Sequence, residues 1–291
     1  MKVLISTDTS AVLTYDVFKK NDLSVFALNV IVDGQEYLDG ITIDQPTLCT
    51  AMRSGKSIKT STPPLGEVIE YFENLFNQGY DKIIHFTISS KLSSMNDLFK
   101  NVAKNNFPGK LFVVDSYAVS TAMLSQVLYA SEEVKKGTPI EDILKEIENR
   151  KMINRVVFVP ENLTALKNGG RISPAIALIG NVLGIKPIIS LTDGELQKEG
   201  TTKQVRKLMI ESAEKFLENY PASEYDYTLI NFDGKPETLT YISNAVEDLI
   251  GKGNLISGIL PINVCAHCGP GTIGLIVSKK INGKSLKEFL Y

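Results

Sequence analysis

Hydroxyl side chains gather in two short segments of the chain and are the residues with the clearest chemical potential. The segments are Lys59–Pro64 (KTSTPP) and Thr87–Ser94 (TISSKLSS). Each leads into a segment with the pattern of a helix start, and the backbone N–H groups of a helix start suit a carboxylate or a phosphate. Neither segment contains a His, Cys or acidic residue that could activate a hydroxyl. We therefore expect these residues to hold a small anionic group rather than to attack one.

Helix capping is a competing explanation for part of these hydroxyls. Thr62 precedes Pro63, where an N-cap residue is expected, and Ser94 with Asp97 has the spacing of a capping box. Capping gives Thr62 and Ser94 a structural task. The hydroxyl residues that then remain as candidate ligand-binding residues are Thr60, Ser61 and Ser93.

Three further residues have side chains suited to acid–base or metal chemistry. Asp8 and Asp115 are predicted at strand ends, and His267 at a strand end before a glycine-rich turn. A stand-alone hydrolase or phosphotransferase that uses Asp8, Asp115 or His267 is therefore the alternative function. The simpler interpretation is that the aspartates hold the following loops and that the histidine bonds to backbone. His85 lies within an apolar strand pattern and is expected in the core.

Two glycine-containing motifs resemble nucleotide-binding sequences but lack their context. Gly269–Gly274 (GPGTIG) matches Gly-x-Gly-x-x-Gly, yet a strand pattern follows it where a dinucleotide fold needs a helix. Gly55-Lys56-Ser57 resembles the end of a phosphate-binding loop, but Thr50 stands where the first glycine belongs. The Gly-x-Ser-x-Gly elbow of hydrolases does not occur. We therefore expect neither nucleotide binding nor hydrolysis by such an elbow.

The cysteines indicate neither a disulfide framework nor a metal centre. The chain has three, Cys49, Cys265 and Cys268, which is a low and odd number. Cys265 and Cys268 have the spacing of a redox motif, but Gly-Pro-Gly follows them instead of a helix. A zinc site needs about four ligands, and no second Cys or His pair exists in the sequence. We expect no metal and no cofactor.

Composition is that of an ordinary globular protein. Of 291 residues, 43% are hydrophobic and 22% charged, with a formal net charge of −2. No basic block occurs, so nucleic acid is not an expected partner. The first residues turn polar too soon for a signal peptide. The most apolar stretch, Ala175–Leu191, is interrupted by Asn181, Lys186 and Pro187 and falls short of the about 20 residues of a membrane span. A cytoplasmic location is the expectation.

The first half of the chain supplies the elements that position the hydroxyl segments. Strand and helix patterns alternate there, which is typical of a largely parallel sheet with helices on both faces. The predicted strands are Val3–Ser6, Leu23–Val32, Lys82–Thr87 and Lys110–Val114. The predicted helices are Leu65–Gln78, Ser94–Asn105, Ala118–Lys136 and Thr138–Arg150. In such a sheet the ligand crevice lies at the carboxyl ends of the strands, which is where the second hydroxyl segment begins.

The second half restarts with its own strands and helices. The predicted strands are Arg155–Val159, Lys186–Leu191, Glu195–Glu199, Tyr227–Phe232, Ile256–Val264 and Ile273–Ser278, the second and third forming a hairpin around Asp193-Gly194. The predicted helices are Glu161–Lys167, Ser173–Val182, Lys203–Asn219 and Glu237–Ile250. We therefore predict an α/β fold of two domains. Residues 1–153 form a mainly parallel sheet flanked by helices with the anion-binding loops, and residues 154–291 form a mixed α/β domain.

Several motifs occur in the order seen in the DegV family, over about residues 3 to 280. They are Thr7-Asp8-Thr9-Ser10, Lys59-Thr60-Ser61-Thr62-Pro63, Ser89-Ser90-Lys91-Leu92-Ser93, Gly169-Gly170-Arg171-Ile172-Ser173, Lys186-Pro187 and His267-Cys268-Gly269-Pro270-Gly271. Because several independent motifs share it, the resemblance is specific. It implies a two-domain α/β fold in which an acyl chain is buried between or within the domains.

The resemblance also implies a function. Members of the family are bacterial fatty-acid-binding proteins, similar to the acyl-carrying subunit of a two-part fatty acid kinase. Such a carrier is not itself an enzyme: it holds a long-chain fatty acid while a separate ATP-binding subunit phosphorylates the carboxylate to an acyl phosphate. Transient contact with a membrane surface is compatible with this role. The family motifs place the fatty acid carboxylate at Thr60 and Ser93, with Ser61, Arg171 and His267 beside it.

The chain departs from the family pattern at a few positions near these motifs. Thr62 replaces the usual Gln, Ser94 replaces the usual Gly, and Met95 and Asn96 occupy positions that are usually small and aromatic. Cys268 replaces the usual Thr or small residue. None of these changes removes a head-group donor, so they bear on loop geometry and chain-length preference.

Overall fold

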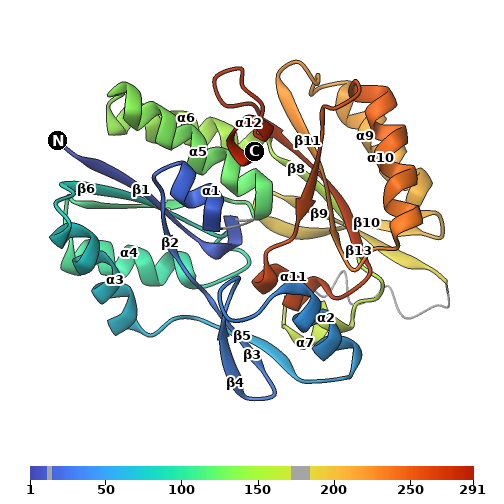
Figure 1. Cartoon of the computed structure of the whole chain (residues 1–291), viewed down its shortest axis with the longest axis horizontal. Coiled ribbons are helices and arrows are strands. Elements are labelled where there is room, and N and C mark those ends of the chain that lie inside the picture. Colours follow the sequence, from blue (N-terminus) through green and yellow to red (C-terminus); the bar gives the residue numbers. More distant parts are fainter. Residues whose placement is uncertain (12–14, 172–183) are drawn as a thin grey trace.

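The computed structural model describes residues 1–11, 15–171 and 184–291 (Figure 1). The described strands form three sheets, two from residues before Asn154 and one from residues after it. The predicted α/β class is confirmed. Sheet membership thus changes at Asn154, while the division into two domains, 1–153 and 154–291, stays a prediction. The predicted helix Ser173–Val182 lies outside the described residues.

Four strands of the first half form a parallel sheet in the order β2-β1-β6-β7. Their bounds are Val3–Asp8 for β1, Ser24–Phe26 for β2, Lys82–Thr87 for β6 and Leu111–Asp115 for β7. All but the first residue of β1 and of β6 are buried, as expected for strands that helices cover on both faces. The alternation predicted from the sequence is confirmed for this sheet.

Helices cover the two faces of this parallel sheet in pairs. One face carries α3 (Leu65–Asn77) and α4 (Met95–Asn106), and the other carries α5 (Ser120–Lys136) and α6 (Ile140–Ile153) (Figure 1). Gly137 ends α5 with a left-handed φ of 79°, a conformation that glycine adopts without steric cost. These four helices agree with the predicted ones to within three residues at each end.

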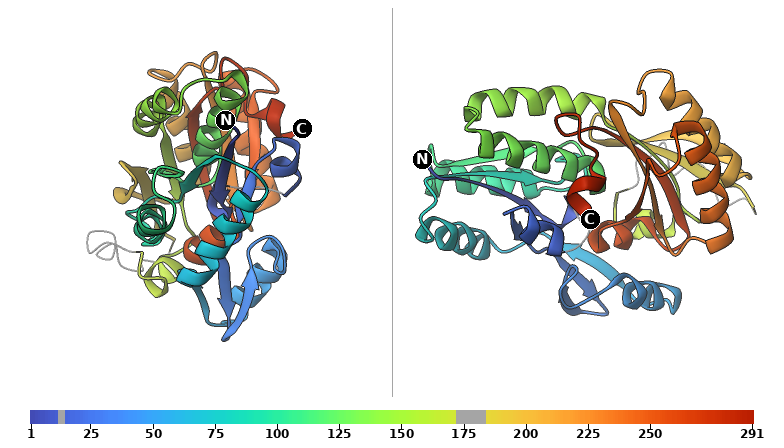
Figure 2. Two further views of the ribbon diagram at one scale, coloured as in Figure 1. Left: turned by 90° about the vertical axis from the view of Figure 1, so that its left-hand side faces the viewer. Right: turned by 45° about the horizontal axis from the view of Figure 1, so that its top comes forward.

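A small antiparallel sheet, which the sequence patterns did not predict, projects from the rest of the molecule (Figure 2). Its order is β4-β3-β5, with bounds Asn29–Val32 for β3, Gln35–Leu38 for β4 and Ile58–Ser61 for β5; α2 (Gln45–Arg53) precedes β5. The single strand predicted over Leu23–Val32 is wrong. Between β2 and β3 the chain leaves the parallel sheet, because the backbone N–H of Leu28 donates to Thr9 Oγ1 instead of a strand neighbour.

The second half forms a mixed sheet of six strands in the order β10-β9-β8-β13-β11-β12. All neighbours are antiparallel except β11 and β12. The bounds are Arg155–Val159 for β8, Lys186–Thr192 for β9, Glu195–Thr202 for β10, Tyr225–Phe232 for β11, Leu255–Ile259 for β12 and Thr272–Lys279 for β13. The predicted hairpin is confirmed: Asp193 and Gly194 both have positive φ, as a two-residue turn of type I′ requires.

The outer face of the six-stranded sheet packs against two long helices. Val157, Leu229 and Leu275 belong to the hydrophobic cluster on this side. The helices are α9 (Val205–Leu217) and α10 (Pro236–Ile250), which lie side by side over the sheet (Figure 1). Because side chains alternate between the two faces of a strand, the residues next to these point the other way, toward the first half.

The inner face of the six-stranded sheet carries Val156, Phe158 and Ile230, which belong to the hydrophobic cluster shared with the first half. Gly274 of β13 lies between Phe158 and Ile230 in the strand register. A Cβ at Gly274 would be only 2.7 Å from Phe158 Cβ. Glycine is therefore required there for the phenyl ring and the isoleucine to lie flat on the same face.

The remaining elements are short. They are η1 (Thr9–Ala11), α1 (Tyr15–Lys20), α7 (Thr164–Asn168), α11 (Ile262–Cys268) and α12 (Lys287–Leu290). The strand predicted over Ile256–Val264 is wrong in its second part: β12 ends at Ile259 and α11 begins after Pro261. Proline cannot donate to a strand ladder, and its fixed φ favours a helix start.

The two halves are held together by packing and hydrogen bonds. Helix α5 contacts both β1 and β13, so it lies between the two large sheets. Ser89 Oγ of the first half donates to the carbonyl oxygen of Gly194 at 2.6 Å. One hydrophobic cluster includes residues from both halves. No helix in the described part of the chain combines the length and the apolar character that crossing a membrane requires.

Candidate functional site

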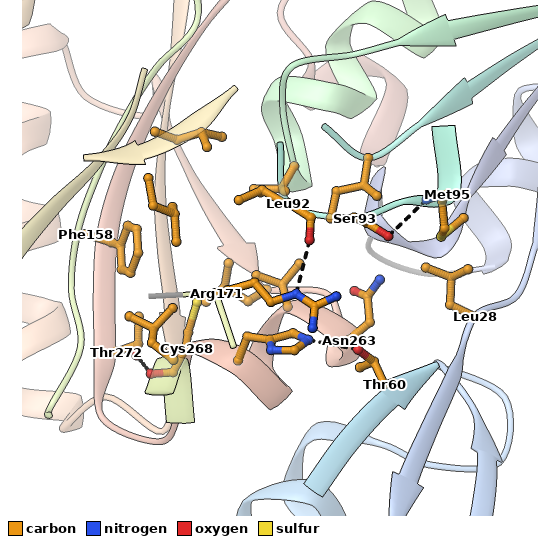
Figure 3. A pocket seen from close by; sticks show the side chains of 18 of the residues that line it. Leu28, Thr60, Leu92, Ser93, Met95, Phe158, Arg171, Asn263, Cys268 and Thr272 are labelled. Atoms are coloured by element: carbon orange, nitrogen blue, oxygen red, sulfur yellow. Dashed lines mark hydrogen bonds between the residues drawn. The ribbon is translucent and has the colours of Figure 1, made fainter. Parts of the chain in front are cut away.

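A mostly apolar pocket lies where the two halves of the chain meet (Figure 3). The pocket and the solvent-open space at its mouth together comprise about 1010 Å³ that protein atoms do not fill. The first half contributes Leu28, Ile88, Met95 and Val119, and the inner face of the six-stranded sheet contributes Val156, Phe158, Leu191, Leu196 and Ile230. Two apolar walls thus face one another, and an apolar chain lying along them would gain about 25 cal/mol per Å² of surface removed from water.

All the residues predicted to bind a head group line this pocket; they are Thr60, Ser61, Ser93, Arg171 and His267. Four separate parts of the fold supply them: β5, the loop before α4, the segment after α7, and α11. Thr60 Oγ1 and His267 Nε2 are hydrogen bonded at 2.9 Å although they are far apart in the sequence. The fold therefore gathers the five residues at one place, and their contact with a ligand stays a prediction.

His267 lies on helix α11, and its predicted place at a strand end is wrong. Burial, with a smaller contribution from the Arg171 charge, lowers the pKa of His267 to about 4, so the imidazole is neutral at pH 7. Its Nδ1 is buried and has no hydrogen-bond partner among the described residues. Gly169 packs against this nitrogen so closely that a Cβ on residue 169 would lie 2.1 Å from it. Glycine at this position therefore makes room for the ring.

Arg171 reaches across the mouth of the pocket from the segment after α7. Its Nε donates to the carbonyl oxygen of Leu92 at 3.1 Å, and its Nη1 donates to that of Gly169 at 2.7 Å. Within the described residues Arg171 forms no salt bridge. The guanidinium is held in place, points toward Asn263 and Thr60 (Figure 3), and favours an anion at this end of the pocket.

The hydroxyls that were predicted to cap helices do something else. Ser94 makes no side-chain cap bond to α4, and α3 begins after Pro64 without a side-chain cap, so both capping predictions are wrong. The extended backbone of Pro64 (ψ 140°) moves the helix start beyond the reach of Thr62. Thr62 Oγ1 lies 3.2 Å from Ser94 Oγ instead. This contact holds the two hydroxyl segments side by side.

Ser93 has both a structural contact and a place at the pocket. Its Oγ accepts from the backbone N–H of Met95 at 3.3 Å, so it supports the first turn of α4. The hydroxyl hydrogen is not used in that bond, because the oxygen is the acceptor. Ser93 therefore keeps a donor for a group in the pocket.

Asp8 and Asp115 hold loops, as the simpler interpretation predicted. Asp8 accepts from the backbone N–H groups of Ser10 (2.7 Å) and Ile88 (2.9 Å), and Asp115 accepts from two backbone N–H groups of adjoining loops. Desolvation raises the pKa of Asp8 to about 6. Neither aspartate lines the pocket that His267 lines. The geometry therefore does not favour a hydrolase or phosphotransferase built on these three residues.

His85 is a core residue, as predicted. Its ring stacks on Phe99 with 4.5 Å between ring centroids, and its Nδ1 is hydrogen bonded to Ser6 Oγ at 2.9 Å. Burial lowers the pKa of His85 to about 3. A neutral, enclosed imidazole of this kind has no access to a ligand.

The two cysteines of α11 are buried thiols. Desolvation raises the pKa of Cys268 to about 12 and raises that of Cys265 as well, so both stay protonated at pH 7. Among the described residues no cluster of three or more His, Cys, Asp or Glu side chains is placed to bind a metal. Cys268 does line the pocket, where a protonated thiol behaves as a small apolar side chain.

Asn263 is a polar pocket residue that the sequence patterns missed. It is 6% exposed and lies four positions before His267, on the same face of α11. The signal that could have found it is this spacing. The apolar pattern of Ile256–Val264 predicts a strand, and a strand does not place residues four apart as neighbours in the way a helix does.

Comparison with known proteins places the chain in a family. The model of the family described as uncharacterised protein, DegV family, matches residues 2–280. A DegV domain-containing protein of Mycoplasmopsis pulmonis is 28% identical over 282 residues, which is 96% of either chain. A Thermus thermophilus structure described as fatty acid binding of a DegV family protein has a TM-score of 0.85 and 25% identity, covering 96% of this chain and 100% of that one. A stearic-acid-binding protein of Eubacterium ventriosum has a TM-score of 0.83 and 23% identity, covering 97% and 99%. This chain belongs to the DegV family.

Proposed function

We propose that this protein binds a long-chain fatty acid in the pocket and presents its carboxylate to a separate ATP-binding kinase subunit. The observation that carries the proposal is the make-up of one pocket. Two apolar walls meet beside hydroxyls, a neutral imidazole and a guanidinium. The description of the Thermus thermophilus DegV family protein as fatty acid binding supports the same ligand.

The acyl tail supplies most of the affinity in this proposal. A long acyl chain has a dozen or more methylenes, and burial of each is worth about 0.8 kcal/mol, or on the order of 10 kcal/mol in all. A hydrogen bond to a charged group such as this carboxylate contributes about 1.5–3 kcal/mol net. The tail therefore sets affinity, and the polar residues set the position of the head group.

Thr60 and Ser93 donate to the carboxylate in this proposal. His267 is neutral, so one ring nitrogen carries hydrogen and the other does not. If Nε2–H donates to Thr60 Oγ1, the threonine hydroxyl hydrogen is free for the ligand. Nδ1 then carries no hydrogen and faces Gly169 with its lone pair. In this tautomer no imidazole N–H is buried without an acceptor. The imidazole thus orients a donor, while Arg171 supplies positive charge.

The kinase partner is what the resemblance to the family implies, and the pocket lining is compatible with it. A carboxylate is already ionised, so it attacks the γ-phosphorus of ATP without a base, forming an acyl phosphate as the bond to ADP breaks. The only titratable side chains of the described pocket, apart from the Cys268 thiol, are Arg171 and His267. Neither glycine motif has the context of a nucleotide site. In this proposal the phosphoryl donor is bound by the second protein, and the neutral hydroxyls leave carboxylate lone pairs free.

Mass spectrometry of lipid extracted under denaturing conditions tests the ligand. We expect a long-chain fatty acid in about molar proportion to protein made in lipid-replete cells.

The Thr60→Ala, Ser93→Ala double variant should lose most acyl phosphate formation with a purified kinase subunit, while it keeps most of its tail-driven affinity. A matched control is Ser90→Ala, because Ser90 belongs to the same hydroxyl segment as Ser93 but does not line the pocket.

Two results would contradict the proposal. Protein that carries no fatty acid and does not take it up from solution rules out the ligand. A double variant that forms acyl phosphate at the wild-type rate rules out the assignment of Thr60 and Ser93, while leaving fatty acid binding in place.

A further inference from the structure

Asn263 occupies an unusual position at the meeting point of the two halves. Its backbone N–H donates to Asp39 Oδ2 at 3.0 Å, and its side-chain Nδ2 donates to Ser10 Oγ at 2.6 Å. Both partners belong to the first half, whereas Asn263 belongs to α11 of the second. The main chain and one end of the amide are therefore fixed from the side away from the pocket.

The other end of the same amide faces the pocket. Oδ1 of Asn263 is buried and has no hydrogen-bond partner among the described residues. Figure 3 shows it on the side of the Arg171 guanidinium, with Thr60 nearby. Buried side-chain oxygens in native proteins nearly always have a partner. An unpaired one beside predicted head-group residues points to a ligand group that completes it.

We propose that Asn263 is a further head-group residue, whose amide turns over to donate an Nδ2–H bond to the bound carboxylate. The proposal rests on the fatty acid binding proposed above. Turning the amide about the Cβ–Cγ bond exchanges its donor and acceptor ends without moving the helix. Oδ1 then faces Ser10, whose hydroxyl accepts in the present orientation and donates in the turned one.

The surroundings of Ser10 allow this exchange. The Ser10 side chain also hydrogen bonds to the Asp8 carboxyl. When the Ser10 hydroxyl turns to Asn263 Oδ1, Asp8 keeps the backbone N–H bonds of Ser10 and Ile88. Asp8, Ser10 and Asn263 each keep a hydrogen-bond partner in the turned state. The amide can thus present either its oxygen or its NH₂ group to the pocket. The orientation that presents the NH₂ group suits an ionised head group.

Asn263→Leu tests the proposal, because leucine has a similar shape and neither donor nor acceptor. The probes are hexadecanoic acid and its methyl ester, which share a tail and differ in head-group charge. Hydrogen bonds to charged groups are stronger than those to neutral ones. We expect the variant to lose affinity for the acid about tenfold, and its preference for acid over ester to fall about threefold or more. Asn263→Ala is the second variant if the leucine variant does not fold.

A spectroscopic measurement on the wild-type protein provides an independent reading. The side-chain NH₂ resonances of Asn263 should shift when hexadecanoic acid is added and shift less with the methyl ester. Ser10→Ala is the matched control, because it removes the partner of the amide without touching the ligand. It should weaken acid binding by less than Asn263→Leu does.

The outcomes separate this proposal from the function on which it rests. Unchanged acid affinity in Asn263→Leu, or equal losses for acid and ester, would overturn the role of Asn263, because a purely structural residue does not discriminate head groups. Wild-type protein that binds neither probe would instead overturn fatty acid binding itself.

Discussion

Single buried side chains in this protein bind protons very differently from the same groups in water. Desolvation lowers the pKa of His85 and His267 to about 3 and about 4. The same cause raises the pKa of Asp8 and Asp39 to about 6 and about 7. His85 sits in the core, His267 lines the pocket, and both aspartates are buried. Burial therefore shifts each of these four groups toward its neutral form.

Asp39→Asn should change how stability depends on pH. The folded state raises the pKa of Asp39 from 3.8 to about 7, so it holds the proton more tightly than the unfolded state. That contribution to stability is fully present below about pH 3.8 and is lost as pH rises through about 7. Asparagine cannot ionise. Relative to wild type, the free energy of unfolding of the variant in urea should therefore rise by up to about 2 kcal/mol between pH 5 and pH 8.

The control for this prediction is Asp44→Asn. Hydrogen bonds from Thr47 lower the pKa of the exposed Asp44 carboxyl, so its linkage has the opposite sign. A constant stability difference between Asp39→Asn and wild type across pH 5 to 8 would show that Asp39 ionises as freely in the folded protein as in water.

Short motifs carried the predictions of single site residues. Thr60, Ser93, Arg171 and His267 were found by motif, and they line one pocket. Asn263 was not found, because its environment depends on Ser10 and Asp39, which are far away in the sequence. Partners at such separations are set by the assembled fold.

Elements with strong periodicity were predictable, and short polar ones were not. Helix α5 and strand β6 follow from apolar runs with clear punctuation. The β4 strand is mostly exposed, so its residues carry no apolar pattern. The apolar run around Leu260 fits a strand and a buried helix equally well. Pro261 decides between them, since α11 begins directly after it.

Helix α2 should depend on its N-cap, whereas α4 should not. Asp44 accepts from the backbone N–H of Thr47 at 2.8 Å, which satisfies a free N–H of the first turn. Asp44→Ala should cost about 1 kcal/mol of unfolding free energy. Ser94→Ala should cost clearly less, because Ser94 makes no cap bond. Denaturant unfolding of both variants checks this, and equal losses would contradict it.

The whole molecule is built so that packing crosses the boundary between its halves. One hydrophobic cluster contains Phe86 and Val127 of the first half and Val156 and Ile276 of the second. The pocket lies at the same junction. The arrangement of three sheets was predictable only in part, because the small sheet forms from segments with weak patterns.

Thermal unfolding should therefore show one transition for the whole chain rather than one for each half. A ligand that binds only the folded state should raise the midpoint temperature of this transition. At a ligand concentration of a hundred times the dissociation constant, the expected stabilisation is about 2.7 kcal/mol. Scanning calorimetry with and without hexadecanoic acid checks both points. Two separate transitions, of which the ligand moves only one, would show that the halves unfold independently.

The place of β13 has a consequence for the order in which this protein acquires its parts during translation. β13 is the last strand of the six-stranded sheet along the chain, yet it lies between β8 and β11. The ribosome releases Thr60 and Ser93 early, but the wall opposite them has a gap until residues up to Lys279 have emerged. A growing polypeptide thus holds hydroxyl donors without a closed apolar wall. Under the proposed function, the fatty acid can therefore be loaded only after synthesis has passed this strand.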